Sequence, residues 1–550
     1  MKRLTYLMFS LLLVLSMLLS ACSQEEAATN TPEPAVEAPE PTDTPVPPTE
    51  VPPEPKQLVI ATVVDIVDMD PARAFSDTYL VAGKAMYDTL VELDIDNSGQ
   101  FLPGLAESWE INADSTVYTY HLRQGVKFES GRELTAQDVK WSLERLQNLQ
   151  GNPGWLMDGV ESVEAVDDYT VQVTMAQSDS SFLAKTSVVY TAPLDSVVAE
   201  ENGCVAGPDA AETDACKEYL DETSLGTGPF ILERWVRDSE IRLVANPNHW
   251  RGEPAFGSVV FKYVNDATAQ AQLLQRGDAD FAMNLDPDTA QQLEGTSGIV
   301  LDKALSQSIL YLAFNTNPEI SEVTANPLFR QAVLYAVDHE GINMLLAGFA
   351  TTPPGILSVG MLGADTVTGY ERDVEKAKEL LAEAGLDGGV ELELTYAGIV
   401  QFGVDFNVVA QKLQADLAEV GITLTLSPGE FSVWITPFRA GETAFTLGYN
   451  TPDYLDPHAV TQVFALSEGV FAKRMNYNNP KADELVMAAV ETSDAAERSA
   501  IYAELLELFN DDAVFHALLQ PMEVIGYRDN ITNFRRNPVN KVTLWEIDKE

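Results

Sequence analysis

The stretch Thr451 to Pro457, TPDYLDP, holds the residues with the clearest chemical potential in this 550-residue chain. It places two carboxylates, Asp453 and Asp456, and one aromatic residue, Tyr454, between two prolines, directly after an apolar run. Two nearby carboxylates can form a catalytic acid pair, hold a metal ion or bind a positively charged group. The rest of the chain helps to decide among these three chemistries.

A free metal ion is disfavoured by the spacing of the histidines. No two of them lie at the i, i+4 spacing of a helical metal site, and no cluster of thiolates accompanies them. The histidines are His121, His249, His339, His458 and His516. A metal chelate or haem could still be held by aromatic and apolar walls, so we expect no metal bound directly by side chains and no resident cofactor.

Recognisable catalytic signatures are missing from the sequence. It has no Gly-x-Ser-x-Gly, no His-Glu-x-x-His and no phosphate-binding loop ending in Lys-Ser or Lys-Thr. A glycoside hydrolase carries no such signature, so a secreted enzyme of that class stays open as an alternative. Asp453 and Asp456, however, are three residues apart on one turn and are expected to stand side by side rather than flank a sugar bond. We expect the protein not to be an enzyme.

The charge balance narrows the choice of partners. The chain has 34 Lys and Arg against 84 Asp and Glu, a formal net charge of −50 at pH 7. This charge repels nucleic-acid phosphates, so nucleic acid is not an expected partner. It favours solubility in an exposed compartment, and it also favours cationic or zwitterionic solutes.

The first residues predict export and attachment to a membrane. Lys2 and Arg3 precede an apolar stretch, residues 4–19, that is too short for a stable membrane span. Residues 19–22 (LSAC) resemble a bacterial lipobox, in which Cys22 would be lipidated and become the mature N-terminus. Residues 1–22 are therefore expected to be a lipoprotein signal peptide, with a plain secretory signal as the alternative. The body of the protein would lie at the outer face of the cytoplasmic membrane.

A tether and a disulfide are predicted next along the chain. Residues 23–56 contain ten prolines and eight acidic residues but one basic residue, which predicts a disordered, extended tether. At about 3 Å per residue it could hold a domain on the order of 100 Å from the lipid. Cys204 and Cys216 lie in a Gly/Asp/Ala-rich segment, and in an exported protein a disulfide is favoured over two free thiols.

Alternating helices and strands are expected to position the TPDYLDP segment. Residues 371–396 and 406–426 each read as a helix, a glycine stop and a strand, and such successive units imply a sheet flanked by helices. Near the N-terminus, residues 57–72 read as a strand that breaks into a loop, and residues 77–93 read as a helix. Thr135 is expected to cap the helix that follows it.

Five stretches carry a family resemblance. Residues 102–146 (LPGLAESWEINADSTVYTYHLRQGVKFESGRELTAQDVKWSLERL) resemble the long signature of the family 5 solute-binding proteins of ABC importers, the dipeptide, oligopeptide and nickel receptors. Four further stretches resemble the same family in its order: residues 226–256, 311–342, 374–386 and 476–489. The resemblance covers roughly residues 57–550.

The resemblance implies an α/β fold with two lobes, the large cluster C form of the type II periplasmic-binding-protein fold. A hinge would join the lobes, and a ligand would be enclosed in the cleft between them. The implied division is lobe I at 57–305, with an extra subdomain near 90–225, lobe II at 306–519, and a return to lobe I at 520–550.

The resemblance also implies a function for the opening motif. In peptide receptors of this family the matching aspartate, here Asp453, pairs with the α-ammonium of the peptide. Tyr449 stands where the family commonly has tryptophan, and Tyr454 adds a second aromatic. Arg439 is the nearby candidate for the peptide carboxylate, although a solvated arginine is the favoured interpretation. Asp456 is expected to hold the loop.

We therefore expect a monomeric, membrane-anchored receptor that captures peptides and delivers them to ABC permease subunits and their ATPases. Some family members bind oligosaccharides or metal complexes, so the same role with such a solute is the first alternative.

Overall fold

The computed structural model describes residues 56–63, 65–96 and 99–550, which all lie in one compact unit, Pro55–Glu550. The expected signal peptide, including Cys22, and the tether up to Pro55 lie outside the described residues. Within the described part of the chain, no helix is both long and apolar enough to cross a bilayer.

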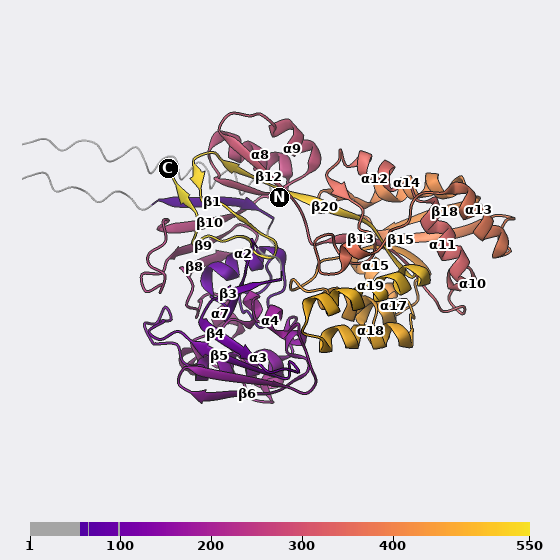
Figure 1. The fold of residues 1–550 in the computed structure, drawn as a ribbon. Coiled ribbons are helices and arrows are strands. Elements are labelled where there is room, and N and C mark those ends of the chain that lie inside the picture. The colour runs from indigo at the N-terminus through magenta and orange to yellow at the C-terminus, as the bar shows by residue number, and fades with distance from the viewer. Residues whose placement is uncertain (1–55, 64, 97–98) are drawn as a thin grey trace, which may run out of the picture. The chain divides into compact units, whose positions relative to one another are not determined.

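A large mixed sheet of the described residues forms the backbone of the unit (Figure 1). Its strands are, in spatial order, β18 (Ile422–Gly429), β15 (Val390–Ala397), β19 (Phe445–Asn450), β13 (Ile309–Phe314), β20 (Phe515–Arg528), β11 (Phe281–Leu285), β1 (Gln57–Thr62), β10 (Ser258–Tyr263), β9 (Glu240–Ala245) and β8 (Phe230–Val236). Two more strands, β12 (Ile299–Leu305) and β14 (Ala350–Thr351), pair with β20 outside this path. The mixed α/β fold expected from the sequence is confirmed.

Strand β20 connects two lobes within the unit (Figure 1). Its first residues pair with β13, and its last seven residues pair with β12. We call the part that contains β1 and β8 to β12 lobe I, and the part that contains β13, β15, β18 and β19 lobe II. Two-lobed architecture, as the sequence predicted, is therefore present.

The two chain segments that pass between the lobes are bonded to each other. One lies between the end of β12 and the start of β13, and the other lies within β20. Ser306 N donates a hydrogen bond to Pro521 O (2.9 Å), and Gln520 Nε2 donates to Ser306 O (2.6 Å). A rotation of the lobes would bend the chain at these two adjacent crossings.

Lobe II is built from the helix–strand units that the sequence predicts. The first is α13 (Val374–Glu383) followed by β15, and the second is α14 (Phe406–Ala418) followed by β18. Gly385 and Gly421 stop the helices with positive φ angles of 73° and 85°, a conformation that glycine adopts without steric cost. Strands β15 and β18 then pair in parallel, as expected of successive units of this kind.

Lobe II also carries α11 (Pro327–Ala336), α12 (His339–Leu345), α15 (Phe431–Arg439), α16 (His458–Phe464), α17 (Val470–Arg474), α18 (Pro480–Glu491) and α19 (Ala495–Asp512).

Lobe I carries a separate four-stranded antiparallel sheet with its own hydrophobic core. Its strands are β4 (Ala106–Ile111), β5 (Val117–Leu122), β7 (Thr170–Met175) and β6 (Val160–Asp167), and α3 (Ala136–Leu149) packs against it. The backbone N–H of Thr135 donates to Asp138 at 2.9 Å, which closes the N-terminus of α3 as expected. The helix expected over 77–93 is shorter than predicted: α2 (Asp77–Met86) ends early, and Val91–Leu93 form strand β2.

A disulfide and a buried ion-pair network fix the loop after this sheet. Cys204 and Cys216 are joined by an S–S bond of 1.96 Å. The guanidinium of Arg145, which is 1% exposed, binds Asp70 (2.7 and 2.9 Å) and Asp214 (2.9 and 3.2 Å). This network ties α3 both to the loop after β1 and to the disulfide segment.

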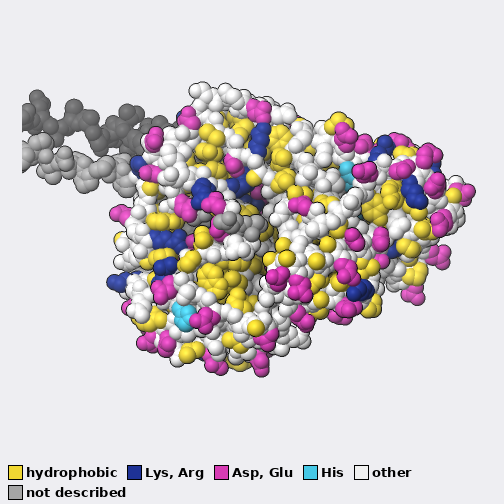
Figure 2. All heavy atoms as spheres, viewed as in Figure 1, with side chains coloured by type: hydrophobic (Ala, Val, Ile, Leu, Met, Phe, Trp, Pro, Cys, Tyr) yellow, Lys and Arg dark blue, Asp and Glu magenta, His cyan; other side chains and the backbone are white. Residues whose placement is uncertain are grey.

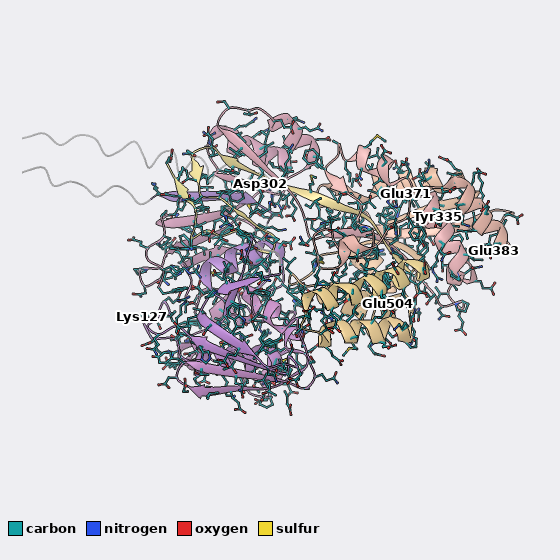
Figure 3. The ribbon with its side chains drawn as sticks, viewed as in Figure 1. Lys127, Asp302, Tyr335, Glu371, Glu383 and Glu504 are labelled. Atoms are coloured by element: carbon teal, nitrogen blue, oxygen red, sulfur yellow. A yellow bond between two sulfur atoms is a disulfide. The ribbon has the colours of Figure 1, made fainter. Side chains whose placement is uncertain are left out.

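Acidic side chains are spread over the outer surface. Figure 2 shows Asp and Glu over the visible face of both lobes, where Lys and Arg are sparser. Glu371, Glu383 and Glu504 are exposed on lobe II and project outward (Figure 3). Water solvates these exposed carboxylates, so this part of the negative charge needs no ligand to stabilise it.

Candidate functional site

A cavity of about 410 Å³ lies between the lobes. Lobe I lines it with the start of α2 and with Tyr190, and lobe II lines it with α15, α17 and the segment that follows β19. Its volume is typical of a small-molecule site. The TPDYLDP segment therefore faces the cleft that the sequence predicts.

The loop that carries Asp453 is fixed by its neighbour Asp456. Both carboxylate oxygens of Asp456 accept hydrogen bonds from the guanidinium of Arg498, at 2.7 and 2.8 Å. Asp456 Oδ1 also accepts from the backbone N–H of His458 at the start of α16 (2.8 Å). The expectation that Asp456 holds the loop is confirmed. Because Asp456 is tied to Arg498, it does not form a free acid pair with Asp453.

Asp453 differs from Asp456 in having no partner. It lines the cavity, is half-buried, and makes neither a hydrogen bond nor a salt bridge with any described residue. Burial, reinforced by the nearby charge of Asp77, raises the pKa of Asp453 to about 7. Burial also raises the pKa of Asp77, which likewise has no salt bridge to a described residue. Lys541, which pairs with Glu523, offsets part of the effect of burial on Asp77, but no described cation forms a salt bridge with Asp77 or Asp453.

Aromatic side chains form the walls around these carboxylates. The ring of Tyr449, at the end of β19, meets Phe402 and Phe406 edge to face, with centroids 5.8 and 6.1 Å away. On the lobe I side, Tyr190 stacks on Phe75 (5.7 Å). Trp434, which the sequence did not single out, also lines the cavity, and its indole N–H donates to a threonine hydroxyl. These packed rings give the site rigid apolar faces.

Tyr454 is packed in the protein interior next to the cavity of Asp453. It is fully buried, its ring lies 5.9 Å from that of Trp155, and its hydroxyl accepts a hydrogen bond from Gln462 (3.2 Å). It is not among the side chains that line the cavity of Asp453. Tyr454 instead lines a smaller pocket that shares Asp77, Leu80, Thr451 and Pro452 with this cavity, so its contact with a ligand stays a prediction.

Two arginines line the same cavity from lobe II. Arg439 is exposed at the end of α15, and Arg474 is half-buried at the end of α17. The sequence singled out Arg439 and missed Arg474. No signal marks Arg474, since a basic residue near the end of a short helix ordinarily faces solvent.

A neighbouring cavity of about 550 Å³ adjoins the first. It shares Asp65, Asp77, Gln401 and Phe402 with the first cavity. Gln401 and Phe402 belong to a hairpin formed by β16 (Val400–Gln401) and β17 (Val404–Asp405). This hairpin reaches from lobe II toward the start of α2, so it lies between the two cavities.

Neither cavity is lined by a group of metal ligands among the described residues. The one such group in that part of the chain is Cys204, Asp214 and Cys216, and its sulfurs form the disulfide. Folding does bring two histidines together that sequence spacing kept apart: His339 Nε2 and His516 Nε2 are 3.1 Å apart. One ring donates to the other there, and burial lowers the pKa of both.

The chain is similar to proteins of one family along most of its length. The family model described as bacterial extracellular solute-binding proteins, family 5 Middle, matches residues 100–496. Di/tripeptide-binding protein 2 of Pseudomonas aeruginosa is 28% identical, over 88% of this chain and 93% of that protein. Heme-binding protein A of Haemophilus influenzae is also 28% identical, over 83% of this chain and 85% of that protein.

The fold matches solved structures as well. The binding protein DppA from Helicobacter pylori, solved in complex with the peptide STSA, superposes with a TM-score of 0.74. It is 26% identical and covers 90% of this chain and 98% of its own.

Proposed function

Because the chain belongs to the bacterial extracellular solute-binding proteins of family 5, we propose that it is a receptor that captures short peptides between its two lobes and delivers them to an ABC importer. Asp453 binds the α-ammonium of the peptide, and Tyr449 forms an aromatic wall beside the peptide backbone. The protein acts by binding and release rather than by catalysis.

The unpaired carboxylate of Asp453 carries this proposal. A half-buried carboxylate with no hydrogen-bond or salt-bridge partner destabilises the ionised form, and a ligand ammonium removes that penalty through a charge-assisted hydrogen bond. Asp77 adds a second negative charge to the same end of the cavity. The location of Asp453 between the lobes suits a ligand that becomes enclosed when the two lobes close.

Peptides are favoured as the solute class by two of the similar proteins. One carries di- and tripeptide binding in its name, and another was solved with a bound peptide. The relative named for heme binding supports a chelate as the alternative solute, and the aromatic walls would suit either.

Native mass spectrometry of the purified full chain tests the proposal without a guess about the ligand. A ladder of added masses that fragment as short peptides is the expected result. If the added mass is that of a haem or a metal chelate, or if the added masses differ by hexose units, the receptor role would stand. Asp453 would then not be the site of a peptide ammonium. Turnover of a glycoside that is lost in Asp453→Asn would overturn the receptor role itself.

Titration calorimetry with an identified peptide then tests Asp453 directly. Asp453→Asn should weaken binding at least about tenfold, the effect of one charged hydrogen bond. Its control is Glu371→Gln, which removes a carboxylate from an exposed position outside the cavity and should leave the dissociation constant unchanged. An unchanged dissociation constant for Asp453→Asn would reject the role of this carboxylate.

We propose further that lipid on Cys22 anchors the protein to the outer face of the cytoplasmic membrane and that residues 23–56 act as its tether. Multiple acyl chains give lasting attachment, which one chain does not. The receptor would then act as a monomer beside the permease subunits and their ATPases. Cys22→Ala should move the protein from the membrane fraction to the soluble fraction, and its retention in membranes would contradict the anchor.

A further inference from the structure

We propose that the hairpin of β16 and β17 divides the space between the lobes, and that the ring of Phe402 at its tip limits the length of the peptide that can bind. This inference rests on the proposed function and deepens it, because it assigns a residue of this chain to the choice between short and long peptides.

The base of the hairpin is fixed in lobe II. Val404 is 1% exposed and belongs to the hydrophobic core of that lobe. The backbone N–H of Phe406 donates to Ile399 O (3.1 Å), which closes the hairpin at its base. Asp405 accepts a hydrogen bond from the backbone N–H of Asn407 (2.8 Å) and so caps α14. The hairpin therefore moves with lobe II.

The tip of the hairpin meets lobe I. It lies against the start of α9 (Pro287–Leu293), which follows β11. A Cβ on Gly403 would lie 2.9 Å from Pro287 Cδ and 3.4 Å from Asp286 Cα, so a glycine is needed at this close approach. The hairpin thus spans the space between the two lobes.

Phe402 stands on the boundary between the two cavities. The residues that line both are Asp65 and Asp77 from lobe I and Gln401 and Phe402 from the hairpin. Asp453 lines the cavity of about 410 Å³ but not the neighbouring one of about 550 Å³. A peptide whose ammonium lies at Asp453 would therefore have to pass this boundary to enter the second cavity.

The ring of Phe402 is held in place against the usual preference of the turn. Phe402 and Gly403 form a two-residue turn with φ angles of 53° and 73°. Positive φ at both positions is typical of type I′ hairpin turns, in which the first residue is ordinarily Asn, Asp or Gly. A bulky side chain rarely adopts this conformation. Here the ring packs edge to face on Tyr449, with centroids 5.8 Å apart.

This unusual residue points to a role for the ring itself. Asn at the same position would satisfy the turn, yet it would leave the boundary between the cavities without an aromatic side chain. Departures from local preference are expected where function demands them. We assign that function to closing the passage between the cavities.

The size of the first cavity sets the length limit. A compact space of about 410 Å³ is about 9 Å across, and an extended chain advances about 3.4 Å per residue, so it holds about three residues. Without the ring, the two cavities together would offer more than twice the volume of the first. Longer peptides would then be accommodated.

Calorimetry on the full chain with trialanine and pentaalanine tests the inference. The unmodified protein should bind trialanine at least about tenfold more tightly than pentaalanine, because the ring excludes the last residues of the longer peptide. Phe402→Asn removes the ring and keeps a residue that the turn favours. It should bind pentaalanine at least about tenfold more tightly than the unmodified protein does, with little change for trialanine.

Two further variants show whether the ring or the hairpin as a whole is responsible. Phe402→Tyr keeps the ring and should keep the preference for trialanine. Phe431→Ala is the matched control, because Phe431 lines the first cavity but not the second. It should leave the ratio of the two affinities unchanged. Thermal unfolding of each ligand-free variant checks that it is folded.

The outcomes distinguish this inference from the proposed function. Equal binding of the two peptides by the unmodified protein, with both lost in Asp453→Asn, would leave the peptide receptor standing and refute the partition. A preference for trialanine that persists in folded Phe402→Asn would place the limit elsewhere and refute the role of this ring. Binding of neither peptide by the unmodified protein would count against the proposed function and, with it, the inference.

Discussion

The affinity for a peptide should rise steeply as the pH increases from 5 to 7, because Asp453 must be ionised to bind an ammonium. The pKa of Asp453 in the ligand-free protein is about 7. At pH 5 only about 1% of this group is ionised, so the affinity should be about 100-fold below its maximum, a difference of ~2.7 kcal/mol. Above about pH 8 the peptide's own amino group loses its proton, and the affinity should fall again.

Isothermal titration calorimetry measures this effect in two independent ways. The dissociation constant is followed from pH 5 to 9, and binding is repeated at pH 6 in buffers of different ionisation enthalpy. At pH 6 the complex should release about 0.9 proton per peptide, since nearly all Asp453 starts protonated. The peptide used should carry no other group that titrates between pH 5 and 7.

Asp453→Asn provides the control. The variant should bind weakly at every pH and release no proton from this site. A flat affinity between pH 5 and 7, or the same pH profile in the variant, would refute the assignment of the ammonium site to Asp453.

The raised pKa of Asp453 also predicts how the stability of the fold changes with pH. The folded protein holds the Asp453 proton more tightly than the unfolded chain does, so ionisation destabilises the fold as the pH rises from about 4 to 7. Asp453→Asn, which cannot ionise, should therefore raise the unfolding temperature of the ligand-free protein at pH 8 and leave it nearly unchanged at pH 4. A decrease at pH 8 would contradict this account.

Four further predictions concern stability. Asp456→Asn should lower the unfolding temperature, because it breaks the partly buried salt bridge to Arg498, whereas Asp453→Asn removes a carboxylate that has no partner. Equal changes in the unfolding temperature of the two variants would contradict this difference. Arg145→Ala leaves two buried carboxylates with Arg73 as their remaining ion-pair partner and should cost up to about 3–5 kcal/mol in urea unfolding. A loss below about 1 kcal/mol would argue against the network. Reduction of the Cys204–Cys216 bond, which spans 12 residues, should cost about 3 kcal/mol in the same assay without weakening peptide binding. Burial lowers the pKa of His458 to about 4, so stability should be lost as the pH falls from 6.5 to 4, and His458→Gln should reduce that loss by up to about 3 kcal/mol.

The sequence predicted lobe II well because its signals are local. The helices α13 and α14 end at the expected glycines, and the strands that follow them pair in parallel. Periodicity and glycine stops act within a few residues, so they can be read without knowledge of distant contacts. The end of α2 was missed, since the apolar spacing continues beyond Met86 although the chain turns into a strand.

Part of the site could also be predicted. Arg439, Tyr449 and Asp453 lie within 15 residues of one another in the sequence, and all three line the cavity. Their contact with a solute stays a prediction. Tyr454 lines the smaller pocket beside this cavity, and sequence adjacency alone did not show that its ring packs away from Asp453.

Composition, local periodicity and one ordered set of motifs determined the α/β class, the family and the loop that carries Asp453. Only the tertiary structure decided which distant groups meet that loop. It brings Asp77 to the carboxylate and places Gly403 against Pro287, although 116 positions separate the latter two in the chain (403 − 287). It also left Asp77 and Asp453 without a salt bridge to any described residue, which no sequence pattern records. The physical reason is that the ionisation and hydrogen bonding of a buried group depend on everything packed around it, and packing is a property of the folded chain.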